Sequence, residues 1–148
     1  MRILFICDRD ICRGPMAVSL LKSKLDHSNA DLRSAGISAV SGNAADPNAV
    51  AVLAERGIVL EHRAQPVTEE LLIWAQLILT MTRAQKFSLI SQLPDTAGKI
   101  YTFHAYVGHS IHDINPPKTN DLFEYRECLN VIESACDLLV QDIEEASA

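Results

Sequence analysis

Five residues separate Cys7 from Arg13 in the segment Cys7-Asp8-Arg9-Asp10-Ile11-Cys12-Arg13-Gly14-Pro15. A short apolar run precedes this segment, and Pro15 suits the first turn of a helix that follows it. A loop that enters a helix N-terminus turns backbone N–H groups inward and adds the positive end of the helix dipole, which favours an oxyanion such as phosphate. Arg13 would bind two oxygens of that anion in a fork. Cys7, with its pKa lowered by the same field, would attack phosphorus in line and form a phosphocysteine intermediate.

The elements that must position this loop follow from the hydrophobic pattern. The pattern predicts strands at 2–6, 32–35, 77–81 and 99–103, with helices at 16–22, 48–56, 68–72 and 83–92. A final helix from residue 122 to 143 carries apolar residues three and four apart, and its Cys128 and Cys136 are predicted to fill the core. The alternation predicts a single α/β domain, residues 1–148, with a four-stranded parallel sheet covered by helices on both faces. Ligands of such sheets bind beyond the carboxyl ends of the strands, which is where the loop after the first strand would lie.

The composition excludes several classes of protein. The chain has 148 residues, 48% of them hydrophobic, and a formal net charge of −6, which disfavours a nucleic-acid backbone as partner. No apolar run approaches the ~20 residues of a membrane helix, and no signal peptide is evident, so a soluble cytoplasmic protein is expected. The four cysteines lack zinc-site spacing, which disfavours a bound metal. The acidic C-terminal helix and an exposed cleft are compatible with a homodimer without requiring one.

These residues resemble the low-molecular-weight protein tyrosine phosphatase family, whose loop reads C-x-G-N-[IT]-C-R-S-P near the N-terminus. Further segments at the family's spacing are Ser34-Ala35-Gly36, Asp46-Pro47, Gly57-Ile58, His62-Arg63-Ala64, Val67-Thr68 and residues 77–81. The resemblance implies hydrolysis of a phosphomonoester, on a phosphorylated protein or a small molecule, without a metal or organic cofactor. Inorganic phosphate would be the product or an inhibitor.

The resemblance also implies roles for individual residues. Cys7 would be the nucleophile and Arg13 the phosphate-binding residue. His62 would brace the loop from behind, and Cys12 would protect Cys7 through a reversible disulfide. The remaining phosphate-binding loop residues would be Asp8, Arg9, Asp10, Ile11, Cys12 and Gly14.

The loop departs from the family pattern at three positions. Arg9 and Asp10 replace the family's Gly and Asn. Asp tolerates a positive φ nearly as well as Asn, but its negative charge should weaken anion binding. Gly14 replaces a Ser whose hydroxyl, in the family, bonds the cysteine thiolate. Its absence predicts a higher pKa for Cys7 and slower hydrolysis of the intermediate.

The later part of the chain departs from the pattern as well. The stretch Asp113-Ile114-Asn115-Pro116-Pro117 places Pro116 where the family has its general acid. Asp113 is the candidate replacement, with a loop-capping role as the alternative, and Asp121 is a second candidate. Neither Ala39-Val40 nor Pro117-Lys118 supplies the aromatic walls that bind phosphotyrosine, although Ile11 matches the tyrosine-specific members.

Two functions are therefore expected from the sequence. The first is a phosphatase with weak activity that works through Cys7. The alternative is a catalytically impaired module on the same fold that binds phosphate or a phosphoprotein. Arsenate reduction is disfavoured because no cysteine lies between Cys12 and Cys128.

Overall fold

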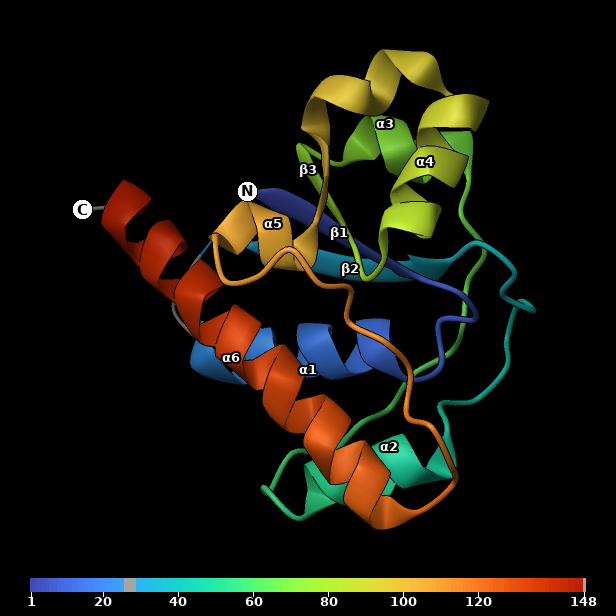
Figure 1. Ribbon diagram of the computed structural model, residues 1–148, viewed down its shortest axis with the longest axis vertical. Coiled ribbons are helices and arrows are strands. Elements are labelled where there is room, and N and C mark those ends of the chain that lie inside the picture. Colours follow the sequence, from blue (N-terminus) through green and yellow to red (C-terminus); the bar gives the residue numbers. More distant parts are fainter. Residues whose placement is uncertain (26–28, 148) are drawn as a thin grey trace.

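The computed structural model describes residues 1–25 and 29–147 (Figure 1). The strands are β1 (Arg2–Cys7), β2 (Asp31–Gly36), β3 (Leu77–Thr80) and β4 (Ile100–Thr102). The helices are α1 (Arg13–Lys24), α2 (Pro47–Ala54), α3 (Glu69–Trp74), α4 (Arg83–Gln92), α5 (Phe103–Val107) and α6 (Leu122–Ser147), with a 3-10 helix η1 (Pro94–Lys99). Within these described ranges, no helix is both long and apolar enough to cross a lipid bilayer.

The sheet is parallel throughout and has the strand order β2-β1-β3-β4. This confirms the predicted four-stranded parallel sheet. The central strand β1 is paired on both sides, with Cys7 opposite Gly36 of β2 and Ile6 opposite Thr80 of β3. The loop that follows β1 therefore begins at the middle of the carboxyl edge, between the ends of two neighbouring strands.

Helices cover both faces of the sheet, as expected (Figure 1). Ile3, Phe5 and Cys7 of β1 point into a core shared with α1, α2, α5 and α6, because alternate side chains of a strand face opposite sides. Leu4 and Ile6 point into a smaller core beneath α3 and α4. Both Cys128 and Cys136 of α6 are buried in the larger core, as predicted.

The acidic side of α6 is partly neutralised by basic residues of the neighbouring helices. Lys24 at the end of α1 lies 2.9 Å from a carboxylate oxygen of Asp137, and Arg56 after α2 lies 2.6 Å from one of Glu133. These ion pairs join α6 to the ends of α1 and α2, and α1 directly follows the cysteine loop, which we define as residues 7–13.

Side-chain caps begin several helices, and one of them ends β4 earlier than expected. Asp46 caps α2 by accepting from the N–H of Asn48 at 3.0 Å, with Pro47 in the first turn. Strand β4 was expected to run to residue 103, but Phe103 instead begins α5. The Oγ1 of Thr102 accepts from the N–H of Ala105 at 3.3 Å, so a threonine cap ends the strand and starts this short helix.

Candidate active site

The cysteine loop is held by its carbonyl groups, which bond outward to surrounding segments. The carbonyls of Cys7 and Asp8 accept from the N–H groups of Ile37 and Ser38 at 3.0 and 2.7 Å. The Ile11 carbonyl accepts from Asp46 N–H at 2.8 Å. Since each peptide group points its N–H opposite to its C=O, this arrangement turns N–H groups of the loop toward the pocket it encloses, at the N-terminus of α1.

Gly36 lets the end of β2 lie directly against the cysteine loop. A Cβ at this position would lie 2.7 Å from the carbonyl oxygen of Asp8 and 2.8 Å from the backbone nitrogen of Asp10. Any side chain would push these backbone atoms out of place. The absence of a side chain at Gly36 therefore allows the cysteine loop to pack closely against the end of β2.

Cys7 lies at the end of β1 with its thiol almost fully buried. Burial raises the pKa of this thiol from 9.0 to about 11; the N–H of Gly14 and the charge of Arg13 oppose the rise, and the charge of Asp10 adds to it. The lowering expected from the field of the loop is therefore wrong in direction, whereas the higher pKa expected from Gly14 agrees in direction, with burial as its main cause. The pattern indicated the helix dipole but not the depth at which the thiol is packed.

Arg13 is buried and anchored at two points. Its Nη1 donates to the carbonyl oxygen of Ile114 at 2.9 Å, and its Nη2 donates to Oδ2 of Asp8 at 3.2 Å. The first contact joins the N-terminus of α1 to the 108–121 segment, 101 residues later in the chain. Arg13 and Cys7 line the same pocket, as a phosphate-binding residue and its nucleophile would.

Asp10 adopts a φ of 56°, which confirms the left-handed backbone expected at this position. Its side chain is fully buried, and Oδ2 accepts from the N–H of Gln65 at 2.9 Å. The other oxygen, Oδ1, has no hydrogen-bond partner in the described part of the chain. Asp10 thus keeps the shape of the loop but adds a buried negative charge next to Cys7.

His62 lies behind the loop, against Asp10. Its Nε2 donates to the backbone oxygen of Asp10 at 2.7 Å and lies 3.3 Å from Oδ2 of the same residue. Partial burial lowers the pKa of His62, but the hydrogen bond and charge of Asp10 outweigh this effect, so the net direction is upward. A protonated His62 would offset part of the Asp10 charge.

Gly14 leaves little room for the serine that the family pattern has at this position. A Cβ here would lie 3.2 Å from both Sγ of Cys7 and Cβ of Ser34, and 3.6 Å from Oδ1 of Asp10. A hydroxyl on that Cβ would therefore reach either the thiol or the unpartnered carboxylate oxygen.

The pocket above Cys7 has a volume of about 370 Å³. The cysteine loop forms its floor, and Asp46, Tyr125 and residues 116–120 form its walls. The hydroxyl of Tyr125 donates to Oδ2 of Asp46 at 2.5 Å. The sequence placed Asp46 only in the Asp46-Pro47 segment and did not predict Asp46 or Tyr125 as a site residue. Asp46 precedes a helix, and helix N-termini meet at the carboxyl edge of a parallel sheet, so this rule could have predicted Asp46 in the pocket.

Asp113 and Asp121, the two candidates for the general acid, both bond to helix starts. Asp113 Oδ1 accepts from the N–H of Arg83, the first residue of α4, at 2.9 Å. Asp121 Oδ1 accepts from the N–H of Phe123 in α6 at 2.9 Å. Neither lines the pocket, whose carboxylates are those of Asp8, Asp10 and Asp46. The contact with Arg83 supports the capping alternative for Asp113, and its acid role is a hypothesis that substitution tests.

Cys12 lies half-buried beside Cys7 in the same pocket. Burial raises the pKa of its thiol, and the neighbouring Cys128 and Asp46 add to the rise. Both Cys7 and Cys12 are free thiols. Their disulfide stays a prediction.

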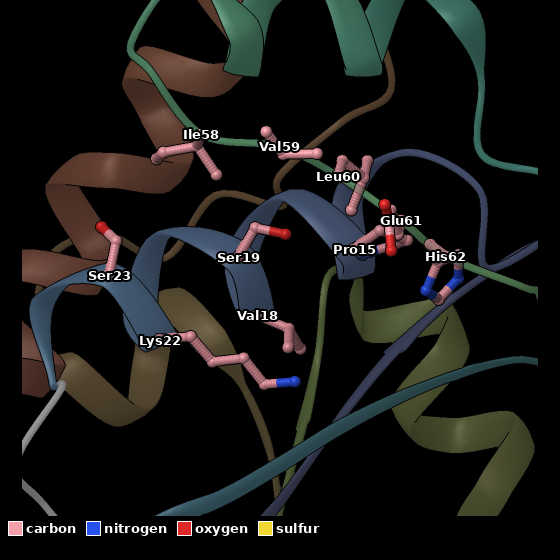
Figure 2. Close-up of a pocket in the computed structure, with 10 residues that line it drawn as sticks. All are labelled: Pro15, Val18, Ser19, Lys22, Ser23, Ile58, Val59, Leu60, Glu61 and His62. Atoms are coloured by element: carbon pink, nitrogen blue, oxygen red, sulfur yellow. The ribbon is translucent and has the colours of Figure 1, made fainter.

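A second pocket, of about 570 Å³, lies between α1 and residues 58–62 (Figure 2). His62 stands at one end of it, while Ser19 and Lys22 of α1 line its side. It does not include Cys7 or Arg13, so the smaller pocket is the one equipped for phosphate chemistry. Across residues 1–25 and 29–147, no cluster of three His, Cys, Asp or Glu side chains is arranged to hold a metal ion.

Comparisons with known proteins agree with this geometry. The family model described as Low molecular weight phosphotyrosine protein phosphatase matches residues 2–148. The chain is 34% identical to the protein-arginine-phosphatase of Bacillus subtilis (98% of each chain), and 39% identical to the "probable low molecular weight protein-tyrosine-phosphatase EpsP" of Ralstonia nicotianae (95% of this chain, 94% of that one). The solved structure of the YwlE arginine phosphatase from Geobacillus stearothermophilus superposes with a TM-score of 0.94 at 32% identity, covering 98% of this chain and 94% of that chain. The family model and these relatives show that the chain is a member of the low molecular weight phosphotyrosine protein phosphatase family.

Proposed function

We propose that Cys7 is the nucleophile of this phosphatase and that Arg13 binds the phosphoryl group during transfer. The observation that carries the proposal is the cysteine loop itself. Its outward carbonyls, the thiol of Cys7 and the anchored guanidinium of Arg13 meet at the N-terminus of a twelve-residue helix. Such a site binds a phosphoryl group by N–H donors and positive charge, the two features that phosphoryl transfer needs most.

The proposed reaction has two steps. In the first, Cys7 Sγ attacks phosphorus, the bond from phosphorus to the leaving oxygen breaks, and the thiol proton passes through a phosphate oxygen to that leaving oxygen. The products are phosphocysteine and the free alcohol. In the second, water attacks phosphorus, inorganic phosphate leaves, and Cys7 regains its proton. In this route the proton of the Cys7 thiol, whose pKa is raised by burial, is the proton that reaches the leaving oxygen.

The activity is proposed to depend strongly on the leaving group. The pocket carboxylates all accept hydrogen bonds: Asp8 from Arg13 and Gln85, Asp46 from Asn48 and Tyr125, and the buried Asp10 from Gln65. Asp113, outside the pocket, caps α4. No pocket carboxylate is thus left as an evident proton donor. A substrate with a good leaving group needs less help from an acid, so it should be turned over best.

The proposed substrates are phosphorylated side chains of proteins, with small phosphomonoesters as surrogates. The relatives described above are named as arginine and tyrosine phosphatases, so phosphoarginine and phosphotyrosine are the two substrates to compare. Pro117 and Lys118 line the pocket where an aromatic wall was expected, and Tyr125 is the aromatic residue in its wall. Four free cysteines fit a reducing compartment, and we place the reaction in the cytoplasm.

Hydrolysis of p-nitrophenyl phosphate by the wild type and by Cys7→Ser tests the proposal. We expect turnover by the wild type that phosphate inhibits, and none by Cys7→Ser. Equal turnover by both proteins would refute the role of Cys7. Phosphate binding without turnover would instead support the alternative, a phosphate-binding module on the same fold.

A further inference from the structure

Asp8 and Gln85 connect the guanidinium of Arg13 to the first turn of α4. Nη2 of Arg13 donates to Oδ2 of Asp8 at 3.2 Å, and Oδ1 of the same carboxylate accepts from Nε2 of Gln85 at 2.8 Å. Gln85 lies 77 residues beyond Asp8 in the chain. The contact therefore joins the segments that follow two neighbouring strands, the loop after β1 and the helix after β3.

The amide of Gln85 has a fixed orientation. Its Oε1 accepts from the N–H groups of Met81 and Thr82 at 2.9 and 3.0 Å, as part of the capping box that begins α4. Rotating the amide would face its NH₂ group against these two donors. Gln85 is also almost fully buried, whereas the Asp8 side chain is 58% exposed. The order of Asp8 therefore comes from Gln85 and Arg13.

The contacts of Arg13 leave its inner side available. A guanidinium carries five N–H donors. One on Nη1 goes to Ile114 and one on Nη2 goes to Asp8, and Arg13 lines the pocket above Cys7. A guanidinium anchored at two points loses little conformational freedom when its remaining donors bind an anion.

We propose that Asp8 and Gln85 are positioning residues, which hold Arg13 in the orientation that receives the phosphoryl group. The inference rests on the proposed function of the cysteine loop, and it assigns neither residue a step of the reaction. The alternative is that Asp8 weakens phosphate binding, because its carboxylate competes with phosphate for the guanidinium of Arg13 and repels the dianion. Positioning is favoured because Asp8 contacts one nitrogen of the guanidinium and is itself held from behind by Gln85.

The two side chains allow an exchange that conserves net charge. In Asp8→Asn, the new amide can still accept from Arg13, but its NH₂ group faces the NH₂ group of Gln85. In Gln85→Glu, the new carboxylate still caps α4 but faces the carboxylate of Asp8. The double variant restores complementarity: the amide at position 8 donates to the carboxylate at position 85 and accepts from Arg13. A double-mutant cycle then isolates the contact.

Two measurements follow for each protein: the inhibition constant of inorganic phosphate, and KM and kcat for p-nitrophenyl phosphate. We expect each single variant to weaken phosphate binding and raise KM by about tenfold, the loss typical of a hydrogen bond to a charged group. The double variant should return both values to within about threefold of the wild type. Glu61→Gln removes an exposed carboxylate near His62 that contacts neither residue, and it controls for net charge.

Each other outcome counts against positioning. Tighter phosphate binding in Asp8→Asn, beyond that in Glu61→Gln, would show competition instead. A fall in kcat with an unchanged phosphate inhibition constant would show loss of folded protein only. Failure of the double variant to recover would mean that the contact does not orient Arg13. Phosphate binding, followed by calorimetry, reports on Arg13 even if the wild type has no Cys7-dependent turnover. Failure of the proposed function can therefore be distinguished from failure of the positioning role.

Discussion

His62 holds Asp10 through two of its oxygen atoms, one from the backbone and one from the side chain. Nε2 lies 2.7 Å from the carbonyl oxygen and 3.3 Å from Oδ2. The first contact fixes the left-handed turn of the cysteine loop, and the second places an imidazole beside a fully buried carboxylate. Loop shape and loop charge thus depend on the same side chain, and this pairing explains how the fold accommodates an aspartate at this position.

The His62 pair predicts a pH-dependent contribution to stability. Because Asp10 raises the pKa of His62 above its unfolded value, the contribution is fully present below the unfolded pKa and disappears as the pH rises through the folded pKa. We expect His62→Gln to lower the free energy of unfolding more at pH 6 than at pH 9, by about 0.5–1 kcal/mol. Urea denaturation at both pH values measures this, with the exposed His112→Gln as control. An equal loss at both pH values would show that the charge of His62 is unimportant.

Replacing Asp10 by Asn should strengthen anion binding. The substitution keeps a residue that tolerates positive φ and removes the negative charge that raises the pKa of Cys7. We expect the inhibition constant of phosphate to fall by about threefold to tenfold, and the rate of Cys7 alkylation by iodoacetamide at pH 8 to rise by a similar factor. Weaker phosphate binding would mean that the contact of Asp10 with His62 supports phosphate binding more than the charge of Asp10 opposes it.

Gly14→Ser should act only together with Asp10→Asn. The added hydroxyl lies within reach of Cys7 Sγ and of Oδ1 of Asp10, and an unpartnered buried carboxylate oxygen is the stronger acceptor. In the single variant the hydroxyl bonds to Asp10, and turnover of p-nitrophenyl phosphate changes little. In the double variant it bonds to the thiolate, and turnover rises above that of Asp10→Asn alone. Additive effects in this double-mutant cycle would contradict the competition between the two acceptors.

The leaving group should control the rate. Without an evident acid in the pocket, kcat/KM for phenyl phosphate is expected to lie below that for p-nitrophenyl phosphate by about 10²–10⁴. Asp113→Asn tests the remaining candidate, since the amide oxygen can still accept from the N–H of Arg83 and keep the cap of α4. We expect no further loss on phenyl phosphate in this variant. A large loss confined to phenyl phosphate would identify Asp113 as the acid.

Peroxide should convert the Cys7 and Cys12 thiols into a disulfide. Peroxide oxidises Cys7 to a sulfenic acid, and Cys12 sulfur then displaces the hydroxyl group as water. Both thiols line one pocket, which supports this pairing. Peptide mapping should find the disulfide, and dithiothreitol should restore activity. In Cys12→Ser, peroxide should oxidise Cys7 irreversibly; full recovery of that variant would argue against protection by Cys12.

The sequence predicts most strands and helices correctly because residues within a few positions of one another determine them. The strand before Cys7, the Asp46-Pro47 cap and the helix at residues 83–92 all arise from patterns within a few residues. Helix α5 is missed because Phe103 suits a strand, and only the cap formed by Thr102 decides otherwise. Local patterns reliably place elements, and a single cap decides an ambiguous boundary.

The site is less predictable because distant contacts determine its chemistry. Asp8 meets Gln85 across 77 residues, and Tyr125 meets Asp46 across 79. The direction of the Cys7 pKa depends on how deeply the thiol is packed, which the hydrophobic pattern does not report. Residue types identified Cys7 and Arg13, whereas tertiary packing sets their environment.

The most direct test of the account is a search for the phosphoryl group on Cys7. The wild type is mixed with p-nitrophenyl phosphate, quenched in acid within milliseconds, and analysed by intact-protein and peptide mass spectrometry, with Cys7→Ala treated in the same way. The phosphocysteine mechanism predicts a phosphorylated peptide that contains Cys7, formed as fast as p-nitrophenol is released in the first turnover and absent from Cys7→Ala. Release of p-nitrophenol with no phosphoryl group on Cys7, at a rate unchanged in Cys7→Ala, would contradict it.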